Sequence, residues 1–157
     1  MKTFFYYFLA FVSIALVSFS GSWFTSLGLD WYNNLNLPSF TPAGSVIGLI
    51  WSIIFFLILV SLILFIRRNK ERKEFLYRVI ILLFVISGLL NILWSAVFFY
   101  WQAILWSILE MMFLNLVNLV LIILLWQKNK LSSILLWPYF IWVSFATYLA
   151  YSIWLLN

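Results

Sequence analysis

The sequence predicts an all-α membrane protein, organised as a single integral membrane domain over residues 1–157. Within it we expect a five-transmembrane-helix bundle with an ordered loop between the first and second helices. Of the 157 residues, 67% are hydrophobic and only 8% are charged. A soluble domain of this length buries only about 70% of the surface that its unfolded chain exposes, so it could not hide this much apolar surface from water. The hydrophobic residues form five runs that lack the alternation of barrel strands. Helices therefore remain as the structure that pairs every backbone group in lipid.

Each run is close to the length of about 20 residues that a membrane-spanning helix needs. The predicted helices cover residues 4–27, 46–66, 79–100, 104–126 and 134–156. The first run has an alternative interpretation as a cleaved signal sequence, because Lys2 precedes it and residues 18–22 are rich in small side chains. Its apolar stretch continues to Leu27, beyond the usual signal core of about 7–15 residues, and we interpret it as a retained helix.

The segments between the helices predict the orientation in the membrane. All nine lysines and arginines lie at the N-terminus, in residues 67–78 and in residues 127–130, which five helices place on one side. By the positive-inside rule this side is cytoplasmic, and the first loop and the C-terminus lie outside. A basic run beside a membrane helix is typical of an anchor on anionic lipid, so we expect the lipid bilayer, and no nucleic acid, as its partner.

The first loop, residues 28–45, is interpreted as an ordered lid. Its prolines Pro38 and Pro42 restrict the backbone, and Thr41 before Pro42 predicts the N-cap and first turn of the second helix. The alternative is that the aromatic residues of this loop, Trp31 and Tyr32, lie at headgroup depth as an interface belt.

Polar and small residues inside the helices are informative because each needs a partner or a cavity. At 100° per residue, one face is marked in each of four helices. These faces hold Gly48, Trp51 and Phe55; Gly88, Asn91, Ser95 and Phe98, with Trp94 in reach; Ser107, Glu110 and Asn118; and Trp142, Ala146, Leu149 and Ile153. For Ser107, Asn115 and Asn118 we favour hydrogen bonds and small-residue contacts between helices. For Trp51, Asn91, Trp94 and Trp142, a structural role and a ligand pocket both remain open.

Two further observations concern chemistry. Glu110 is the only acidic residue well inside a predicted span. It is either a proton or cation site, or a protonated carboxyl bonded to Asn118, and we favour the second. The sequence contains no histidine and no cysteine, which argues against most metalloenzymes and hydrolases. We expect no metal site and no required cofactor.

Three separated blocks of the sequence resemble the translocator protein family, also called tryptophan-rich sensory proteins or peripheral-type benzodiazepine receptors. The first block holds Trp31, Tyr32, Leu35, Pro38, Pro42, Gly44, Gly48 and Trp51. The second holds Leu90, Asn91, Trp94, Ser95, Phe98 and Phe99. The third holds Pro138, Tyr139, Trp142, Phe145, Ala146, Leu149, Ile153 and Asn157. The resemblance runs from about residue 21 to the end, with the blocks in the right helix order.

This resemblance implies a five-helix bundle, usually a homodimer, with a pocket for porphyrins and synthetic benzodiazepine-site ligands beneath the first loop. By matching positions, the pocket is lined by Trp51, Asn91, Trp94, Trp142 and Ala146, to which we add Phe55, Gly88 and Leu149 from the same faces. The lid is formed by Trp31, Tyr32, Pro38 and Pro42. Ser95 is expected to bond its own helix.

The sequence also departs from the family. Ala43 stands where many members have a second proline, and Ala150 stands where the last helix often has asparagine. No Lys or Arg follows Tyr151, so the cholesterol-recognition pattern of the mitochondrial branch is absent and sterol transport is not expected. A short chain without this tail looks bacterial, which suggests the bacterial cytoplasmic membrane.

Three functions remain, ranked in this order. The first is binding, sensing or transport of porphyrins, that is protoporphyrin-like tetrapyrroles, or similar planar apolar molecules. The second is light- and oxygen-dependent degradation of porphyrin, with Trp51 and Trp142 as redox partners, and the third is a scaffold whose pocket is incidental. An enzyme is the less favoured interpretation. Since only Met and Tyr remain as axial ligands, we expect metal-free porphyrin to bind at least as well as haem.

Overall fold

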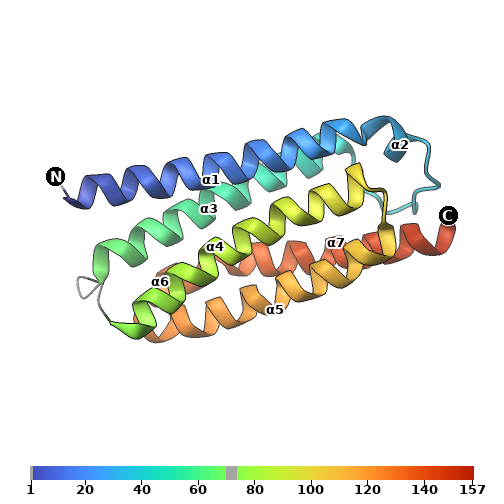
Figure 1. The fold of residues 1–157 in the computed structure, drawn as a ribbon. Helices are drawn as coiled ribbons and strands as arrows, with labels where there is room; N and C mark the ends of the chain where they lie inside the picture. Colours follow the sequence, from blue (N-terminus) through green and yellow to red (C-terminus); the bar gives the residue numbers. More distant parts are fainter. Residues whose placement is uncertain (1, 70–73) are drawn as a thin grey trace.

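The structure is a computed structural model that describes residues 2–69 and 74–157, and the described chain is helical without strands. The helices are α1 (Lys2–Leu27), α2 (Leu29–Asn33), α3 (Gly44–Arg68), α4 (Phe75–Ser95), α5 (Ile104–Lys128), α6 (Lys130–Ile134) and α7 (Trp137–Leu156), with a π-helical turn, η1 (Ala96–Tyr100), directly after α4. Figure 1 shows the long helices side by side along one axis, with the two termini at opposite ends. This arrangement agrees with an odd number of membrane crossings.

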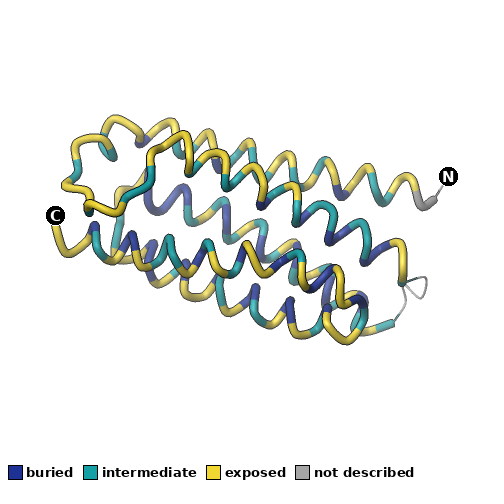
Figure 2. The backbone as a smooth tube through the Cα atoms, turned by 180° about the vertical axis from the view of Figure 1, so that it is seen from behind, coloured by how far each residue is buried: buried dark blue, intermediate teal, exposed yellow. Residues whose placement is uncertain are grey.

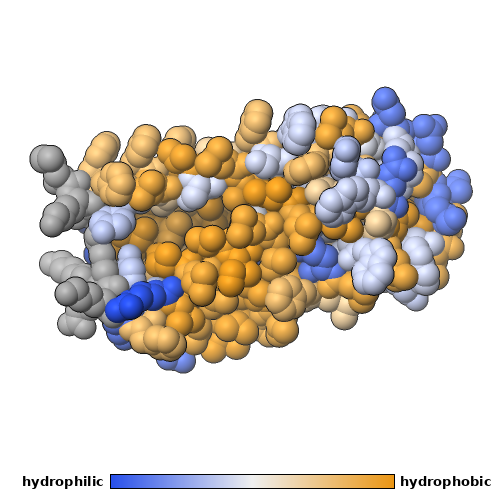
Figure 3. Space-filling view, viewed as in Figure 1, coloured by the Kyte–Doolittle hydropathy of each residue, from blue (hydrophilic) through white to orange (hydrophobic). Residues whose placement is uncertain are grey.

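Five segments are long and apolar enough to cross a membrane, namely α1, α3, α4 with η1, α5, and α6 with α7. Hydrophobic side chains cover the middle of the face seen in Figure 3, and hydrophilic side chains gather mainly toward its two ends. The predicted five-helix membrane fold is therefore confirmed, and the protein is an integral membrane protein.

The helix ends differ from the predicted ones where hydropathy is a poor guide to the backbone. α3 begins at Gly44 with Ala43 as its N-cap, so the predicted capping by Thr41 and Pro42 is wrong. Instead, the Thr41 N–H donates to the Pro38 carbonyl at 3.0 Å, which closes a turn before the helix. At the other ends, helices continue into polar flanks because backbone hydrogen bonding does not stop where the apolar run stops.

The third and fifth predicted helices are not continuous α-helices. The third changes to π-helical geometry at η1, where the Trp101 N–H donates to the Ala96 carbonyl at 2.9 Å. The fifth, predicted over residues 134–156, is interrupted near its start: the chain turns at residues 135–136, so only Ile134 belongs to α6, and α7 begins at Trp137 with Pro138 in its first turn. At η1 the apolar run continues without a break, so hydropathy gives no sign of this change.

The core lies between α4, α5 and α7, since α5 packs most extensively against its two neighbours α4 and α7. Figure 2 shows buried residues recurring along the helices, interspersed with exposed residues that face outward. α1 is peripheral, and Ala10 and Gly21 are its only buried residues in the described part of the chain. In a bilayer, the exposed apolar side chains face lipid.

Hydrogen bonds between helices are found for two of the three residues for which we expected them. The Asn115 amide donates to the Ser144 hydroxyl at 2.7 Å, which links α5 to α7. Asn118 accepts a hydrogen bond from Ser87 of α4, also at 2.7 Å. Ser107 instead donates to the Ile104 carbonyl of its own helix and is fully buried, so it has no hydrogen bond to another helix but keeps the structural position expected of a small residue.

Glu110 does not bond Asn118, and that prediction is wrong too. Its two carboxyl oxygens are buried without a hydrogen-bond partner among the described residues, and Asn118 pairs with Ser87. The two side chains share a stripe of α5, but eight residues separate them by about 12 Å along the helix axis. The angle between two residues on a helix is not sufficient for contact when the rise is this large.

The basic segments lie at one end of the bundle. Arg67 and Arg68 end α3, and Lys128 near the end of α5 forms an ion pair with Glu74 at the start of α4. Of the basic run predicted over residues 67–78, residues 70–73 lie outside the described residues.

Candidate ligand-binding pocket

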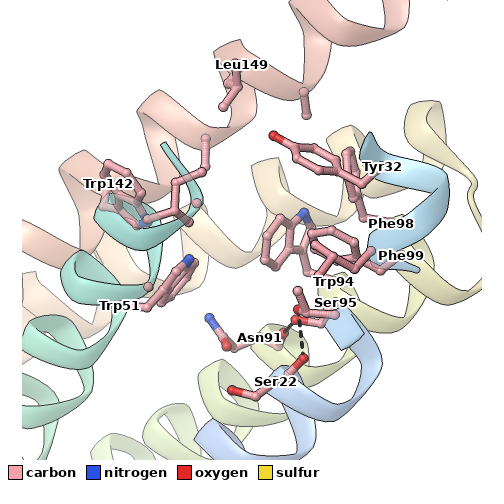
Figure 4. A pocket seen from close by; sticks show the side chains of 18 of the residues that line it. Ser22, Tyr32, Trp51, Asn91, Trp94, Ser95, Phe98, Phe99, Trp142 and Leu149 are labelled. Carbon is pink, nitrogen blue, oxygen red and sulfur yellow. Dashed lines mark hydrogen bonds between the residues drawn. The ribbon is translucent and has the colours of Figure 1, made fainter. Parts of the chain in front are cut away.

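A cavity of about 390 Å³ lies in the half of the bundle nearest the connection between α1 and α3, residues 28–43, which contains α2 and is called the α2 loop below. Its walls come from α1, α3, α4 with η1, and α7, while Leu29 and Tyr32 of α2 contribute to its roof. Figure 4 shows Trp51, Trp94 and Trp142 around this cavity, each from a different helix. Of the four helix faces marked in the sequence, those of α3, α4 and α7 meet at this cavity, whereas that of α5 does not reach it.

Aromatic rings dominate one side of the pocket. The Trp51 ring stacks on Phe55 at 5.6 Å and on Trp94 at 5.9 Å between centroids. Trp94 also contacts Phe98 at 6.0 Å, and Trp142 contacts Phe145 at 5.3 Å. Rings in such contact hold one another in place, so the indole faces form a preformed apolar wall.

Asn91 has two roles in the structure. It lines the pocket, and its side-chain amide donates to the Tyr139 hydroxyl at 3.2 Å. Tyr139 is in turn within 3.4 Å of the Ser87 hydroxyl, which bonds Asn118. Asn91 therefore joins the pocket floor to a buried polar network between α4, α5 and α7. Its structural role is therefore present, and its side chain also borders the cavity.

Ser95 and Gly88 of α4 have structural roles beside the pocket. The Ser95 hydroxyl donates to the Asn91 carbonyl at 3.3 Å, so the expected bond within its own helix is confirmed. Gly88 does not line the main cavity but a smaller one of about 20 Å³ below it. A Cβ at Gly88 would lie 3.0 Å from Val17 of α1, which covers this position. Its absent side chain therefore permits helix packing.

The α1 wall of the pocket was not predicted. It is formed by Ser18, Gly21, Ser22, Thr25 and Ser26. These residues recur at helical spacing along one face, which is the signal that was available in the sequence. Their small size had been considered only as a feature of a signal sequence. Other lining residues without a predicted pocket role are Leu29, Ile47, Ser52, Phe99, Phe145 and Ala150.

The predicted lid residues take different positions. Tyr32 lines the pocket, and its ring contacts Phe98 at 6.1 Å and Phe99 at 5.7 Å. Burial raises the pKa of Tyr32, so its phenol is neutral at physiological pH. Trp31 does not line the cavity but packs edge-on against Phe98 at 5.6 Å. Both aromatic residues thus pack on η1, in agreement with a lid.

The rest of the loop is held by α7. Pro38 and Pro42 are not among the lining residues; they shape the segment that crosses toward α7. In that segment, the Asn36 N–H donates to the Asn157 side-chain oxygen at 2.9 Å, and the Asn157 amide donates to the Asn36 carbonyl at 3.1 Å. Phe40 stacks on Tyr148 at 5.4 Å. The loop therefore spans the pocket from η1 to α7.

The pocket offers hydrogen bonds but no charge. No Lys, Arg, Asp or Glu occurs among its described lining residues. The indole N–H groups of Trp94 and Trp142 are buried without a protein partner in the described part of the chain. An uncharged cavity with aromatic walls and a few polar groups is suited to a planar, largely apolar molecule.

Comparison with known proteins decides the family. The model of the TspO/MBR family matches residues 9–155, which include all four helical walls of the pocket. The chain belongs to the TspO/MBR family. The predicted resemblance is therefore confirmed over almost the whole length of the chain.

Relatives within the TspO/MBR family come from distant organisms. The chain is 33% identical over 128 residues to the tryptophan-rich protein TspO of Bacillus cereus, covering 81% of this chain and 80% of the relative. It is 32% identical over 148 residues to the TspO of Archaeoglobus fulgidus, covering 93% of each. It is 28% identical over 129 residues to the human translocator protein, covering 81% of this chain and 75% of the relative. Tryptophan, which gives the bacterial and archaeal relatives their name, also forms three faces of this pocket.

Proposed function

We propose that this TspO/MBR protein binds porphyrins, or similar planar apolar molecules, in the cavity beneath the α2 loop, and that it acts in their sensing or transport. The observation that carries this proposal is a cavity of about 390 Å³ with indoles from three helices and no charged lining residue. Aromatic walls stack on a flat conjugated ring, and stacking of this kind contributes about 0.5–1.5 kcal/mol beyond area burial. The polar groups of Tyr32 and Asn91 orient the ring.

The test is a titration of the reconstituted protein with protoporphyrin in darkness, followed by tryptophan fluorescence. Saturable quenching with a defined stoichiometry is the expected result. A linear, non-saturating response would support the scaffold interpretation, in which the pocket is incidental.

The pocket offers few side chains that could ligate the iron of haem. The sequence has no His or Cys, and Tyr32 is the only Met or Tyr among the described lining residues. We therefore expect protoporphyrin to bind at least as tightly as haem. A clearly higher affinity for haem, with a sharp low-spin spectrum, would contradict this expectation.

A second candidate function is light- and oxygen-dependent degradation of porphyrin. The contact between Trp51 and Trp94, and the edge-on contact of Trp51 with Tyr139 at 6.1 Å, favour it because they connect oxidisable rings. This function predicts loss of porphyrin absorbance that requires light, oxygen and folded protein. Replacement of Trp51 and Trp142 by Phe is then expected to slow the loss more than it weakens binding.

The cellular location, the membrane orientation and the oligomeric state of the protein are part of the same proposal. We place it in a bacterial cytoplasmic membrane with the N-terminus and basic loops inside, the α2 loop and C-terminus outside, and a homodimer as the assembly. Support comes from the charge distribution of the sequence and from the family resemblance.

A further inference from the structure

The pocket is exposed along one seam. Every lining residue that is exposed belongs to α1, α3 or the first residue of α2. These residues are Ser22, Ser26, Leu29, Gly44, Gly48 and Ser52. The lining residues of α4, η1 and α7 are all buried or half-buried. The cavity therefore reaches the surface between α1 and α3, on the side of the bundle.

Small residues leave the passage open. A Cβ at Gly44 or Gly48 would have no atom within 4 Å, so the space beside both glycines is empty. Gly48 lies about 6 Å along the axis from the start of α3, and Ser52 lies about 6 Å further. The passage therefore extends from the end of the bundle toward the apolar part of the membrane.

The rim is compatible with lipid. The Ser26 hydroxyl donates to the Trp23 carbonyl at 2.7 Å, and the Ser52 hydroxyl donates to the Gly48 carbonyl at 2.9 Å. Serine that donates to its own helix presents no unpaired donor to the bilayer. The oxygens still accept hydrogen bonds, so polar substituents on a passing molecule are tolerated.

The other sides of the pocket are closed by specific contacts. Above, Tyr32 packs on Phe98 and Phe99, and Asn36 bonds Asn157. Below, the hydrogen bond from Asn91 to Tyr139 closes the floor. A molecule that entered through water would have to displace the loop, whereas a molecule from the membrane would not.

We propose that the pocket exchanges its ligand sideways with the bilayer, through the seam between α1 and α3, and that Gly48 keeps this passage open. The inference rests on the proposed function and specifies its ligand as a molecule dissolved in the membrane. A flat ring passes edge first between the helices, and the loop stays closed during exchange.

The test measures the rates of protoporphyrin binding and release in vesicles that contain the full chain. The decisive variant is Gly48→Phe, whose side chain enters empty space and blocks the seam. The matched control is Leu49→Phe, which places the same ring on the neighbouring exposed position, outside the pocket lining. We expect Gly48→Phe to lower the association and dissociation rate constants at least tenfold each, and the equilibrium affinity much less. The Leu49→Phe control is expected to keep both rate constants within about twofold of the wild type.

A second measurement identifies the source of the ligand. With protoporphyrin dissolved in the vesicles beforehand, dilution in buffer at a constant ratio of porphyrin to lipid is expected to leave the binding rate unchanged. A rate that falls with dilution would overturn entry from the membrane, as would wild-type rates in Gly48→Phe. A faster dissociation alone in Gly48→Phe would mean that the new ring invades the binding space, which also overturns the proposal. Absence of saturable binding in the wild type would instead overturn the proposed function itself.

Discussion

Gly28 shows how a single residue positions the lid. It connects α1 to α2, and a Cβ at this position would lie 2.1 Å from the carbonyl oxygen of Phe99 in η1. The obstacle is backbone, which cannot rotate aside as a side chain can. Glycine is therefore required here for steric reasons, and it lets the chain turn over η1 so that Tyr32 reaches the pocket.

We expect Gly28→Ala to destabilise the protein by about 1–3 kcal/mol, because the added methyl group overpacks a rigid contact. Thermal unfolding in detergent measures this change. The matched control is Gly44→Ala, where the methyl group meets no atom within 4 Å and is expected to cause no loss. Equal stability of the two variants would contradict the close contact between Gly28 and Phe99.

Trp51 carries the residue-scale prediction for binding. Its ring contacts Phe55, Trp94 and Tyr139, so it lies at the centre of the aromatic wall. Trp51→Ala is expected to weaken protoporphyrin binding at least tenfold, about 1.4 kcal/mol, whereas Trp51→Phe retains part of the affinity. Fluorescence titration gives both values. A folded Trp51→Ala protein with wild-type affinity would place the ligand outside this pocket.

At the scale of elements, the segment made of α2 and the loop from α2 to α3 is attached at two places with different chemistry. Its aromatic residues Trp31 and Tyr32 pack on η1, and its later residues bond and stack on α7. The contact with α7 joins residues that are about 120 positions apart in the chain. Local propensity cannot produce such a contact, so the closed lid depends on the assembled bundle.

The Asn157 side chain is expected to hold the lid without contributing much to global stability. Asn157→Ala removes two hydrogen bonds to the Asn36 backbone, each worth about 0.5–1.5 kcal/mol. Amide hydrogen exchange in residues 36–40 is expected to accelerate about tenfold, while the unfolding temperature changes little. Asn34→Ala is the control, since the Asn34 side chain bonds only the nearby Asp30 carbonyl. Similar exchange in both variants would show that the contact with Asn157 does not hold the loop.

At the scale of the whole molecule, the asymmetry of the bundle is important. The end near the α2 loop holds the cavity, and the opposite end is closed by polar contacts such as the hydrogen bond from Ser61 to the Ser132 carbonyl at 2.7 Å. Arg67, Arg68 and Lys128 lie at this closed end, and positive charge at a membrane boundary is of the kind that anionic lipid attracts. The pocket and the charge anchor thus occupy opposite halves of the bundle.

The orientation of the bundle is directly testable because the sequence contains no cysteine. A cysteine introduced at Ser39 in the loop is expected to react with a membrane-impermeant maleimide in intact cells. A cysteine at Gln127, near the basic end, is expected to react only after the membrane is permeabilised. The reverse pattern would contradict the orientation predicted from the positive charges.

Sequence by itself determined that lipid surrounds the protein, where the five membrane-spanning segments lie, and which helix faces carry Trp51, Asn91 and Trp142. These properties follow from hydropathy and the 3.6-residue period, which are local and repeat along the chain. The resemblance in three blocks added the family, since spaced motifs in a fixed order are more specific than any single one.

Tertiary structure decided which faces meet. Gly88 shares a helix face with Asn91, yet Val17 of α1 covers Gly88. The small residues of α1 form a pocket wall because α1 packs against α3 and α4 beside the cavity. Glu110 and Asn118 share a stripe but are separated by the helical rise, and Asn118 found its partner on another helix. The physical reason is that side-chain partners depend on the depth and neighbours of each helix. Those are fixed only when the helices pack against one another.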